Sequence, residues 1–285
     1  MTHKSIFVKL SEFKGNPISE YLKISKFAKT RVCSFNGLSF YQIFNSKFEL
    51  CKLLRSHYCD FYDCVSKYEN ALEPYKDCLY EKLPDDIKLE LLDLFLNYCE
   101  ILLCMFYVTI DSYPDLNQLN YYLEKDTFIQ FLEIISTSLK SMNFKIEIVN
   151  EEIGDVKIIK DNPEAECVAK QSPKNIREAI IDYLGSRDSD SKEKEKSLHH
   201  LIDMLELTLE KYENADIVNK VKEYVQLVRH PEKKKEQKEY AWYFKDKTSY
   251  FDLIFSMCIF VQEYSLTKDS IEKFGSLKKE AIAEQ

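Results

Sequence analysis

The hydrophobic and polar positions of this chain repeat with the period of an α-helix over most of its length. The clearest stripe lies in the C-terminal part and consists of Ile176, Ala179, Ile180, Tyr183 and Leu184. Residues at this three-and-four spacing share one face of a helix. Ser172 and Pro173 supply an N-cap followed by a proline at the first helical position, and Gly185 is placed to end the helix.

Three further amphipathic segments follow in the C-terminal part. The second predicted helix has a buried face formed by Leu198, Leu201, Ile202, Leu205, Leu209 and Tyr212. The third has a buried face formed by Ile217, Val221, Tyr224, Val225 and Val228. It ends before Pro231, because proline cannot continue a helix, and a last apolar helix covers residues 249–264. Four such helices with short connections predict an antiparallel bundle over residues 172–285.

The N-terminal part predicts a second helical domain, acidic in its helical portion, over residues 1–142. Residues 48–72 have the spacing of one long amphipathic helix, and residues 85–108 and 125–140 predict two more. The helix over 85–108 begins with acidic side chains, which complement the positive end of the helix dipole. We therefore expect helices to dominate both halves of the chain.

Two short segments depart from the helical period. Residues 144–160 alternate apolar and polar side chains around a glycine, which predicts a β-hairpin within a linker over residues 143–171. Asn36-Gly37 favours a type I′ turn, so residues 32–41 are predicted to form a second hairpin. The predicted fold class is mainly α, with two helical domains, a C-terminal four-helix bundle and these two hairpins.

The most apolar run, residues 89–110, has the length of a membrane span. It carries a polar stripe of Glu90, Asp93, Asn97 and Glu100 at helical spacing. A lipid-facing helix would not carry three acids on one face, so we predict a buried amphipathic helix and no membrane partner. The first fifteen residues have no long apolar core, so no signal peptide is predicted, and a cytoplasmic location is expected.

Charge is distributed unevenly along the chain, whose formal net charge is −8. Residues 1–50 carry eight basic and three acidic side chains, whereas residues 51–142 carry eight basic and sixteen acidic ones. This charge balance does not imply a nucleic-acid coat. The aromatic residues of the basic opening segment either stack on bases or, as we favour, pack in a core: Phe7, Phe13, Tyr21, Phe27 and Phe35.

The cysteine pattern indicates reduced thiols rather than disulfides or zinc. There are nine cysteines, an odd number, and no CxxC pair. Cys59 and Cys64 are five residues apart, as are Cys99 and Cys104, which places each pair on different faces of a helix. We therefore expect mostly buried thiols in a reducing compartment. No glycine-rich phosphate loop is present either, and no cofactor is predicted.

Two histidine clusters remain as candidate chemistry. The first consists of Glu195, His199, Asp203 and Glu206, which share one helix face and have a spacing able to hold a metal. The same pattern is typical of a solvated helix face, and a second histidine on that face is missing. We favour the solvated face and predict no metal site.

The second cluster is Arg229-His230, which stands out because the chain has only five arginines and five histidines. One interpretation is structural, since cations at a helix C-terminus interact favourably with the exposed carbonyls. The other is catalytic. An imidazole can take a proton from a ribose 2′-hydroxyl, and a guanidinium can hold phosphate oxygens with two parallel hydrogen bonds.

The residues after this pair form a locally basic stretch. Residues 228–248 contain seven basic and four acidic side chains, and Lys233, Lys234 and Lys235 are candidates for binding an RNA backbone. Tyr240 and Trp242 either stack on a base or pack in the core, and Trp242 is retained as a candidate RNA-binding residue.

The sequence around these candidates reads IREAIIDYLGSRDSDSKEKEKSLHHLIDMLELTLE and, further on, VKEYVQLVRHPEKKKEQKEYAWYFKDKTSYFDLIFSMCIFVQ. Over about residues 165–265 it resembles the HEPN superfamily of small helical bundles, in the branch found as C-terminal domains of phage abortive-infection proteins. The resemblance implies a metal-independent ribonuclease, or an RNA-binding derivative, that acts as a homodimer in antiviral defence.

Within that resemblance, Arg229 matches the motif arginine and His230 the polar position that follows it. The closing histidine of the motif is absent, because residues 234–236 read Lys-Lys-Glu. Two hypotheses therefore stay open. The chain is either an RNA-cleaving effector that uses Arg229 and His230, with a protein partner on its N-terminal domain, or a non-catalytic helical interaction protein.

Overall fold

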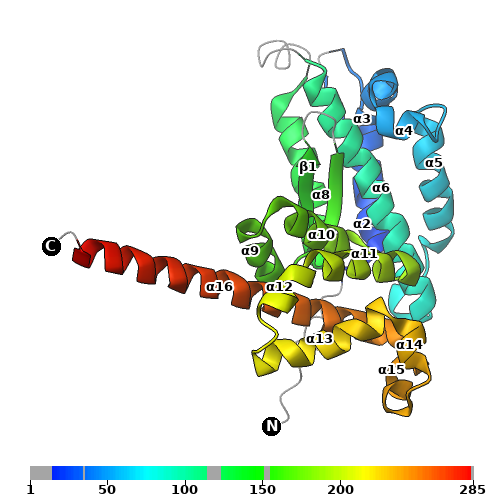
Figure 1. Cartoon of the computed structure of the whole chain (residues 1–285). Helices are drawn as coiled ribbons and strands as arrows, with labels where there is room; N and C mark the ends of the chain where they lie inside the picture. Colours follow the sequence, from blue (N-terminus) through cyan, green and yellow to red (C-terminus); the bar gives the residue numbers. More distant parts are fainter. Residues whose placement is uncertain (1–14, 35, 114–122, 151–154, 284–285) are drawn as a thin grey trace, which may run out of the picture. The chain divides into compact units, whose positions relative to one another are not determined.

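The structure is a computed structural model and describes residues 15–34, 36–113, 123–150 and 155–283. It is 76% helical and contains one two-stranded antiparallel hairpin, which confirms the predicted mainly α fold class. The chain forms two compact units that divide between Asp161 and Asn162. Each unit is described by itself below, with the labels used in Figure 1.

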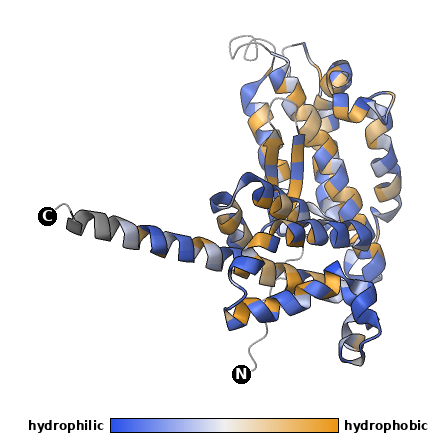
Figure 2. Ribbon diagram, viewed as in Figure 1, coloured by the Kyte–Doolittle hydropathy of each residue, from blue (hydrophilic) through white to orange (hydrophobic). Residues whose placement is uncertain are grey.

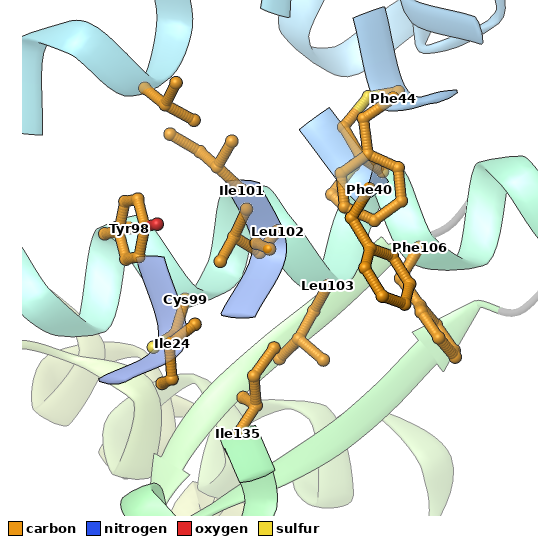
Figure 3. Packing of buried hydrophobic residues seen from close by; sticks show 14 of the residues in the cluster. Ile24, Phe40, Phe44, Tyr98, Cys99, Ile101, Leu102, Leu103, Phe106 and Ile135 are labelled. Carbon is orange, nitrogen blue, oxygen red and sulfur yellow. The ribbon is translucent and has the colours of Figure 1, made fainter. Parts of the chain in front are cut away.

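The N-terminal unit is built around one long buried helix, α6 (Asp85–Asp111). The helices packed against it are α2 (Pro17–Thr30), α3 (Phe40–Lys47), α5 (Phe61–Leu72) and α8 (Lys125–Ser141). Figure 3 shows how side chains of α6 such as Tyr98, Leu103 and Phe106 meet those of the neighbouring helices. The predicted helices over 85–108 and 125–140 are confirmed.

Helix α6 is long and apolar enough to cross a membrane by length and composition alone, and 61% of its most apolar window is buried inside the protein. The polar stripe predicted on it is only partly open to solvent. Glu90 is exposed, whereas Asp93, Asn97 and Glu100 are half-buried. The Glu100 carboxylate accepts a hydrogen bond of 2.9 Å from the backbone N–H of Ile158, so part of the stripe anchors the β-hairpin.

That hairpin pairs β1 (Phe144–Asn150) with β2 (Asp155–Lys160) in antiparallel register, with Phe144 opposite Lys160. It confirms the prediction over residues 144–160. Ile158 and Ile159 are fully buried, and Figure 2 shows both hydrophobic and hydrophilic residues along the strands. The hairpin belongs to the N-terminal unit, whereas residues 162–171 of the expected linker belong to the C-terminal unit.

The single long helix predicted over residues 48–72 is wrong. The segment forms a 3-10 turn, η1 (Phe48–Leu50), then α4 (Lys52–Arg55), and only then α5. Cys51 interrupts the helix because its backbone is extended (φ −84°, ψ 90°). Asp60 starts a new one, since its carboxylate accepts the backbone N–H of Asp63 at 2.7 Å as an N-cap.

The hairpin predicted over residues 32–41 is reduced to a turn. Val32 and Ser39 form an isolated antiparallel bridge, and Gly37 has a positive φ of 76°. Strand pairing goes no further, because Ser39 is already the N-cap of α3 and forms a capping box with Gln42. Among the aromatic residues of the opening segment, Tyr21 is buried in the core and Phe27 packs against it, whereas Phe7, Phe13 and Phe35 lie outside the described residues.

The C-terminal unit is a helical bundle. Its main helices are α9 (Pro163–Gln171), α10 (Lys174–Gly185), α11 (Ser191–Met204), α13 (Asp216–Arg229) and α16 (Phe251–Ala283). Shorter pieces are α12 (Glu206–Lys211), α14 (Pro231–Lys235) and α15 (Ala241–Lys245). Helix α11 packs against α10, α13 and α16. The second predicted helix is divided at Leu205 into α11 and α12, and the last helix extends beyond the predicted residue 264 to Ala283.

Several local details of the bundle differ from prediction. Helix α9 was not expected, and Pro173 occupies the N-cap of α10 rather than its first helical position. The Ser172 hydroxyl instead donates to the Val168 carbonyl at 2.7 Å. On α13, Val221, Val225 and Val228 are buried as predicted, but Ile217 is 50% exposed and Val218 takes its buried place.

A buried ion pair fixes the start of α11. The Lys194 ammonium is nearly enclosed and lies 2.6 Å from an Asp188 carboxylate oxygen and 3.0 Å from one of Asp252 in α16. The Tyr183 hydroxyl donates to the same Asp252 at 2.8 Å. These carboxylates raise the pKa of Lys194 although its burial lowers it. The network therefore holds α10, α11 and α16 together and places the outer face of α11.

Candidate functional site

Residues from both clusters singled out in the sequence, His199 and Asp203 from the first and Arg229 from the second, line one groove on the C-terminal unit. The groove has a volume of about 600 Å³ and is formed by α11, the end of α13 and the start of α14. It is lined by Lys192, Glu195, Lys196, His199, His200, Asp203, Val228, Arg229 and Pro231. Figure 2 shows that α11 is mostly hydrophilic.

Arg229 lies at the end of α13, where Pro231 stops the helix. Its side chain is 17% exposed and is held by two carboxylates of the neighbouring helices. Nη1 donates to Glu206 Oε1 at 2.8 Å, and Nε lies 3.2 Å from Asp203 Oδ1. The hydrogen bond and charge of Arg229 lower the pKa of Glu206, with a smaller contribution from His230. The guanidinium is thus fixed in position at the wall of the groove.

Asp203 also holds His199, which lies one helical turn before it on α11. The distance from His199 Nδ1 to Asp203 Oδ2 is 3.1 Å. An ionised carboxylate only accepts hydrogen bonds, so Nδ1 carries a proton, and in the neutral form of the imidazole Nε2 keeps its lone pair. Asp203 therefore bridges a half-exposed imidazole and a half-buried guanidinium, and we call these three residues the Asp203 cluster.

His230 does not follow its sequence neighbour Arg229 into the groove. It is the C-cap of α13, where its backbone N–H donates to the Gln226 carbonyl at 3.0 Å, and its side chain is exposed. It does not line the groove. The groove therefore contains Arg229 but not His230, and the histidine that shares Asp203 with the arginine is His199.

The predicted RNA-binding residues lie beyond the groove, on α14 and α15. Lys233 and Lys235 are exposed, while the Lys234 ammonium lies 4.7 Å above the Tyr240 ring. Trp242 is 43% exposed, and its ring centroid lies 4.9 Å from that of Tyr250 in an edge-to-face arrangement. Tyr240 is buried and donates its hydroxyl to Glu223 at 2.7 Å, so it packs in the core.

The sequence interpretation missed three groove residues on α11: Lys192, Lys196 and His200. A signal for them exists, because they recur every four residues and so lie along one side of the helix. All three side chains are exposed. Two ammonium groups and a second imidazole therefore line the same groove as the Asp203 cluster.

The acidic face of α11 is engaged in ion pairs. Glu195 accepts two hydrogen bonds of 2.6 and 2.8 Å from the Lys247 ammonium, while Asp203 and Glu206 bind Arg229. Within the described parts of the chain, no group of three or more His, Cys, Asp or Glu side chains is arranged to hold a metal ion. The groove offers protons and positive charge to a ligand rather than a set of metal ligands.

Comparisons with protein-family models, with curated proteins and with solved structures found no match to this chain.

Proposed function

We propose that the C-terminal unit binds RNA in the α11–α13 groove and cleaves it without a metal ion. The observation that carries the proposal is the Asp203 carboxylate, which bridges His199 and Arg229 in the groove wall. A base oriented by a carboxylate, beside a fixed cation, is the arrangement that proton transfer at a phosphodiester requires.

The reaction that fits these groups is attack by the ribose 2′-hydroxyl on the adjacent phosphorus. His199 Nε2 takes the proton of the 2′-hydroxyl as the new O–P bond forms. The P–O bond to the 5′-oxygen breaks, and that oxygen takes a proton from His200, which also lines the groove. The products are a 2′,3′-cyclic phosphate and a free 5′-hydroxyl, and Arg229 stabilises the negative charge on the phosphorane oxygens.

The basic residues around the groove supply affinity for the RNA backbone. Lys192 and Lys196 line it, and Lys233 and Lys235 are exposed on α14, which directly follows Arg229 and His230. Each contact between an ammonium group and a phosphate releases counterions, so binding is expected to weaken with added salt. Lysines contact phosphate without reading bases, which favours broad RNA specificity.

The resemblance to the HEPN superfamily supports the same function and adds a setting. It implies a cytoplasmic effector of phage defence that works as a homodimer, with the N-terminal unit available to a protein partner. In this proposal Arg229 keeps the role that the resemblance assigns to it. His230, at the exposed end of α13, becomes a secondary residue, because the groove places His199 beside the arginine.

A second candidate function is a non-catalytic RNA-binding or protein-interaction domain. The observation that favours it is the double pairing of Arg229, since two carboxylates already satisfy much of its charge. A guanidinium compensated in this way attracts a phosphate less strongly than a free one. In that case lysine substitutions would weaken binding, and histidine substitutions would have no effect.

The experiment is an incubation of the full chain with end-labelled single-stranded RNA and transfer RNA in EDTA. We expect cleavage that is lost in His199→Ala and Arg229→Ala and retained in His57→Ala, a matched control on an exposed histidine of the N-terminal unit. A substrate with 2′-deoxyribose at each position should stay intact. If wild-type protein binds RNA but leaves it intact at high concentration, the non-catalytic candidate replaces the cleavage proposal.

A further inference from the structure

Two cysteines from distant parts of the N-terminal unit lie in direct contact. Cys51 is the residue between η1 and α4, and Cys104 lies in the middle of α6. Their sulfur atoms are 3.4 Å apart, and the side chains are almost fully buried, with exposed fractions of 1% and 8%. A disulfide has a sulfur–sulfur distance of about 2.05 Å, so the two atoms need to approach by about 1.35 Å.

The two thiols differ in reactivity because one hydrogen-bonds to the other. The hydrogen bond from Cys104 lowers the pKa of Cys51 to about 7, although burial opposes the shift. The same contact raises the pKa of Cys104, with burial acting in the same direction. Cys64, nearby in the core, has its pKa raised to about 12, mainly by burial. Cys51 therefore has the most thiolate character of these three and is the expected nucleophile.

An oxidant can reach this pair if the segment around Cys51 opens locally. Between residues 48 and 60, only Phe48 and Cys51 are buried. Helix α4 spans four residues and buries none of them, while Leu50 and Leu53 on either side of Cys51 are 53% and 46% exposed. A segment with so few buried contacts opens at low free-energy cost without unfolding the unit.

We propose that Cys51 and Cys104 form a redox modification site at which hydrogen peroxide, or another peroxide, produces a disulfide. The Cys51 thiolate attacks one peroxide oxygen, the O–O bond breaks, and Cys51 becomes a sulfenic acid while hydroxide leaves. The Cys104 sulfur then attacks the sulfenic sulfur, forming the S–S bond and releasing water. In total two thiols lose two electrons and two protons, and one hydrogen peroxide is reduced to two waters; an alkyl hydroperoxide, whose alkoxide leaves in place of hydroxide, gives one alcohol and one water.

The bond would join the α4 segment covalently to the central helix of the N-terminal core. It closes a loop between residues 51 and 104, which restricts the unfolded chain and stabilises the folded unit. The expected consequence is reversible. Oxidation holds the segment 48–60 in place, and reduction by a thiol such as glutathione releases it. This inference involves none of the groove residues and does not depend on RNA cleavage.

The test uses a background in which the three exposed cysteines are replaced, Cys59→Ser, Cys78→Ser and Cys167→Ser. Nine cysteines minus three leaves six thiols. After treatment with hydrogen peroxide, thiol titration in denaturant should fall from six to four, and the intact mass should decrease by about 2 Da. Peptide mapping without reductant should find Cys51 joined to Cys104, and the melting temperature should rise by about 5–10 °C.

Cys104→Ala and Cys51→Ala should each abolish the mass decrease, whereas Cys64→Ala, a buried neighbour, should retain it. Mapping of the background protein, in which both thiols are present, reports on the bond even if an alanine variant folds poorly. Six thiols remaining after peroxide treatment would overturn the proposal. A bond that maps to a different pair, such as Cys51 with Cys64, would overturn it as well.

Discussion

A carboxylate that joins two side chains from other parts of its unit occurs in both halves of the molecule, and Glu69 and Asp203 differ in their surroundings. In the N-terminal unit, Glu69 accepts hydrogen bonds from the Tyr41 hydroxyl at 2.5 Å and from the Lys29 ammonium at 2.8 Å. Because the Tyr41 hydroxyl donates its hydrogen bond to Glu69, the fully buried Tyr98 hydroxyl is the donor to the Tyr41 oxygen, at 2.6 Å. In the C-terminal unit, Asp203 joins His199 and Arg229 at the surface.

The difference separates a structural cluster from a chemical one. Burial is the largest cause that raises the pKa of Tyr41 and of Tyr98 far above the ordinary tyrosine range, so both phenols stay protonated at any physiological pH. Neither can exchange a proton with a ligand. His199, with a side chain that is 44% exposed, faces solvent in a groove, where an imidazole can exchange protons. Similar hydrogen bonds thus serve stability in one unit and, in our proposal, catalysis in the other.

The largest expected effect is on cleavage, from Asp203→Asn. The amide can donate to His199, which disturbs the tautomer that keeps Nε2 free. We expect the cleavage rate to fall by about 100-fold or more, the range for a misplaced general base. The free energy of unfolding should change by less than about 1 kcal/mol, because the pair is exposed. RNA cleavage assays measure the rate, and urea denaturation measures the free energy of unfolding. A loss of cleavage explained by a large loss of stability would remove the distinction between the clusters.

The next largest effect is on stability, from Tyr41→Phe in the buried cluster. This change leaves Tyr98 without its acceptor and Glu69 without its closest donor. We expect it to lower the free energy of unfolding by about 1–3 kcal/mol. Tyr98→Phe should cost less, because Tyr41 keeps its bond to Glu69. Urea denaturation at neutral pH tests the order of the two variants, and RNA cleavage should stay at the wild-type rate in both.

A smaller effect should appear as pH falls. Arg229 lowers the pKa of Glu206 in the folded chain, so this carboxylate contributes stability above its unfolded pKa, about 4.3 for glutamate. The contribution is lost as pH falls through the lower folded pKa. Glu206→Gln should therefore have a lower urea midpoint than wild type at pH 7 and the same midpoint near the acid limit. A difference that persists unchanged at low pH would show that the carboxylate charge is not responsible.

The smallest effect is the response of each cluster to salt. A double-mutant cycle between Asp203 and Arg229 should give a coupling of about 0.2–1 kcal/mol at low salt, since the pair is partly exposed. In about 1 M sodium chloride, where screening acts over about 3 Å, most of this coupling should disappear. The corresponding cycle between Tyr41 and Glu69 should change little with salt. Coupling of Asp203 to Arg229 that survives high salt would place the pair in a drier environment than its exposure indicates.

The helices that the sequence predicted best are those with a continuous apolar face. The helix over 85–108 and the hairpin over 144–160 appear where the period placed them. Residues 48–72 also have a helical period, but the extended backbone of Cys51 and the N-cap of Asp60 divide them. A helical period predicts which residues lie on the same face, but it does not predict where a helix is interrupted. Asn162-Pro163 begins α9 in the way that Asn16-Pro17 begins α2, so a local signal for the missed helix was present.

The candidate site was predictable in its parts but not in its assembly. Sequence spacing identified the face that carries His199 and Asp203, and the scarcity of arginine identified Arg229. Arg229, at the end of α13, contacts Asp203 of α11, which lies 26 residues earlier in the chain. This contact depends on how α11 packs against α13. His230 was expected to act with Arg229 because the two are adjacent in sequence. In the structure His230 is the C-cap of α13 and does not line the groove.

The most direct test of the central claim is the initial rate of RNA cleavage in EDTA for wild type, His199→Ala and His230→Ala at equal concentration. Our account predicts a loss of about 100-fold or more for His199→Ala and less than about threefold for His230→Ala, since only His199 is the general base. Circular dichroism would confirm that the three proteins are equally helical. Equal rates for wild type and His199→Ala, or the larger loss in His230→Ala, would contradict the account.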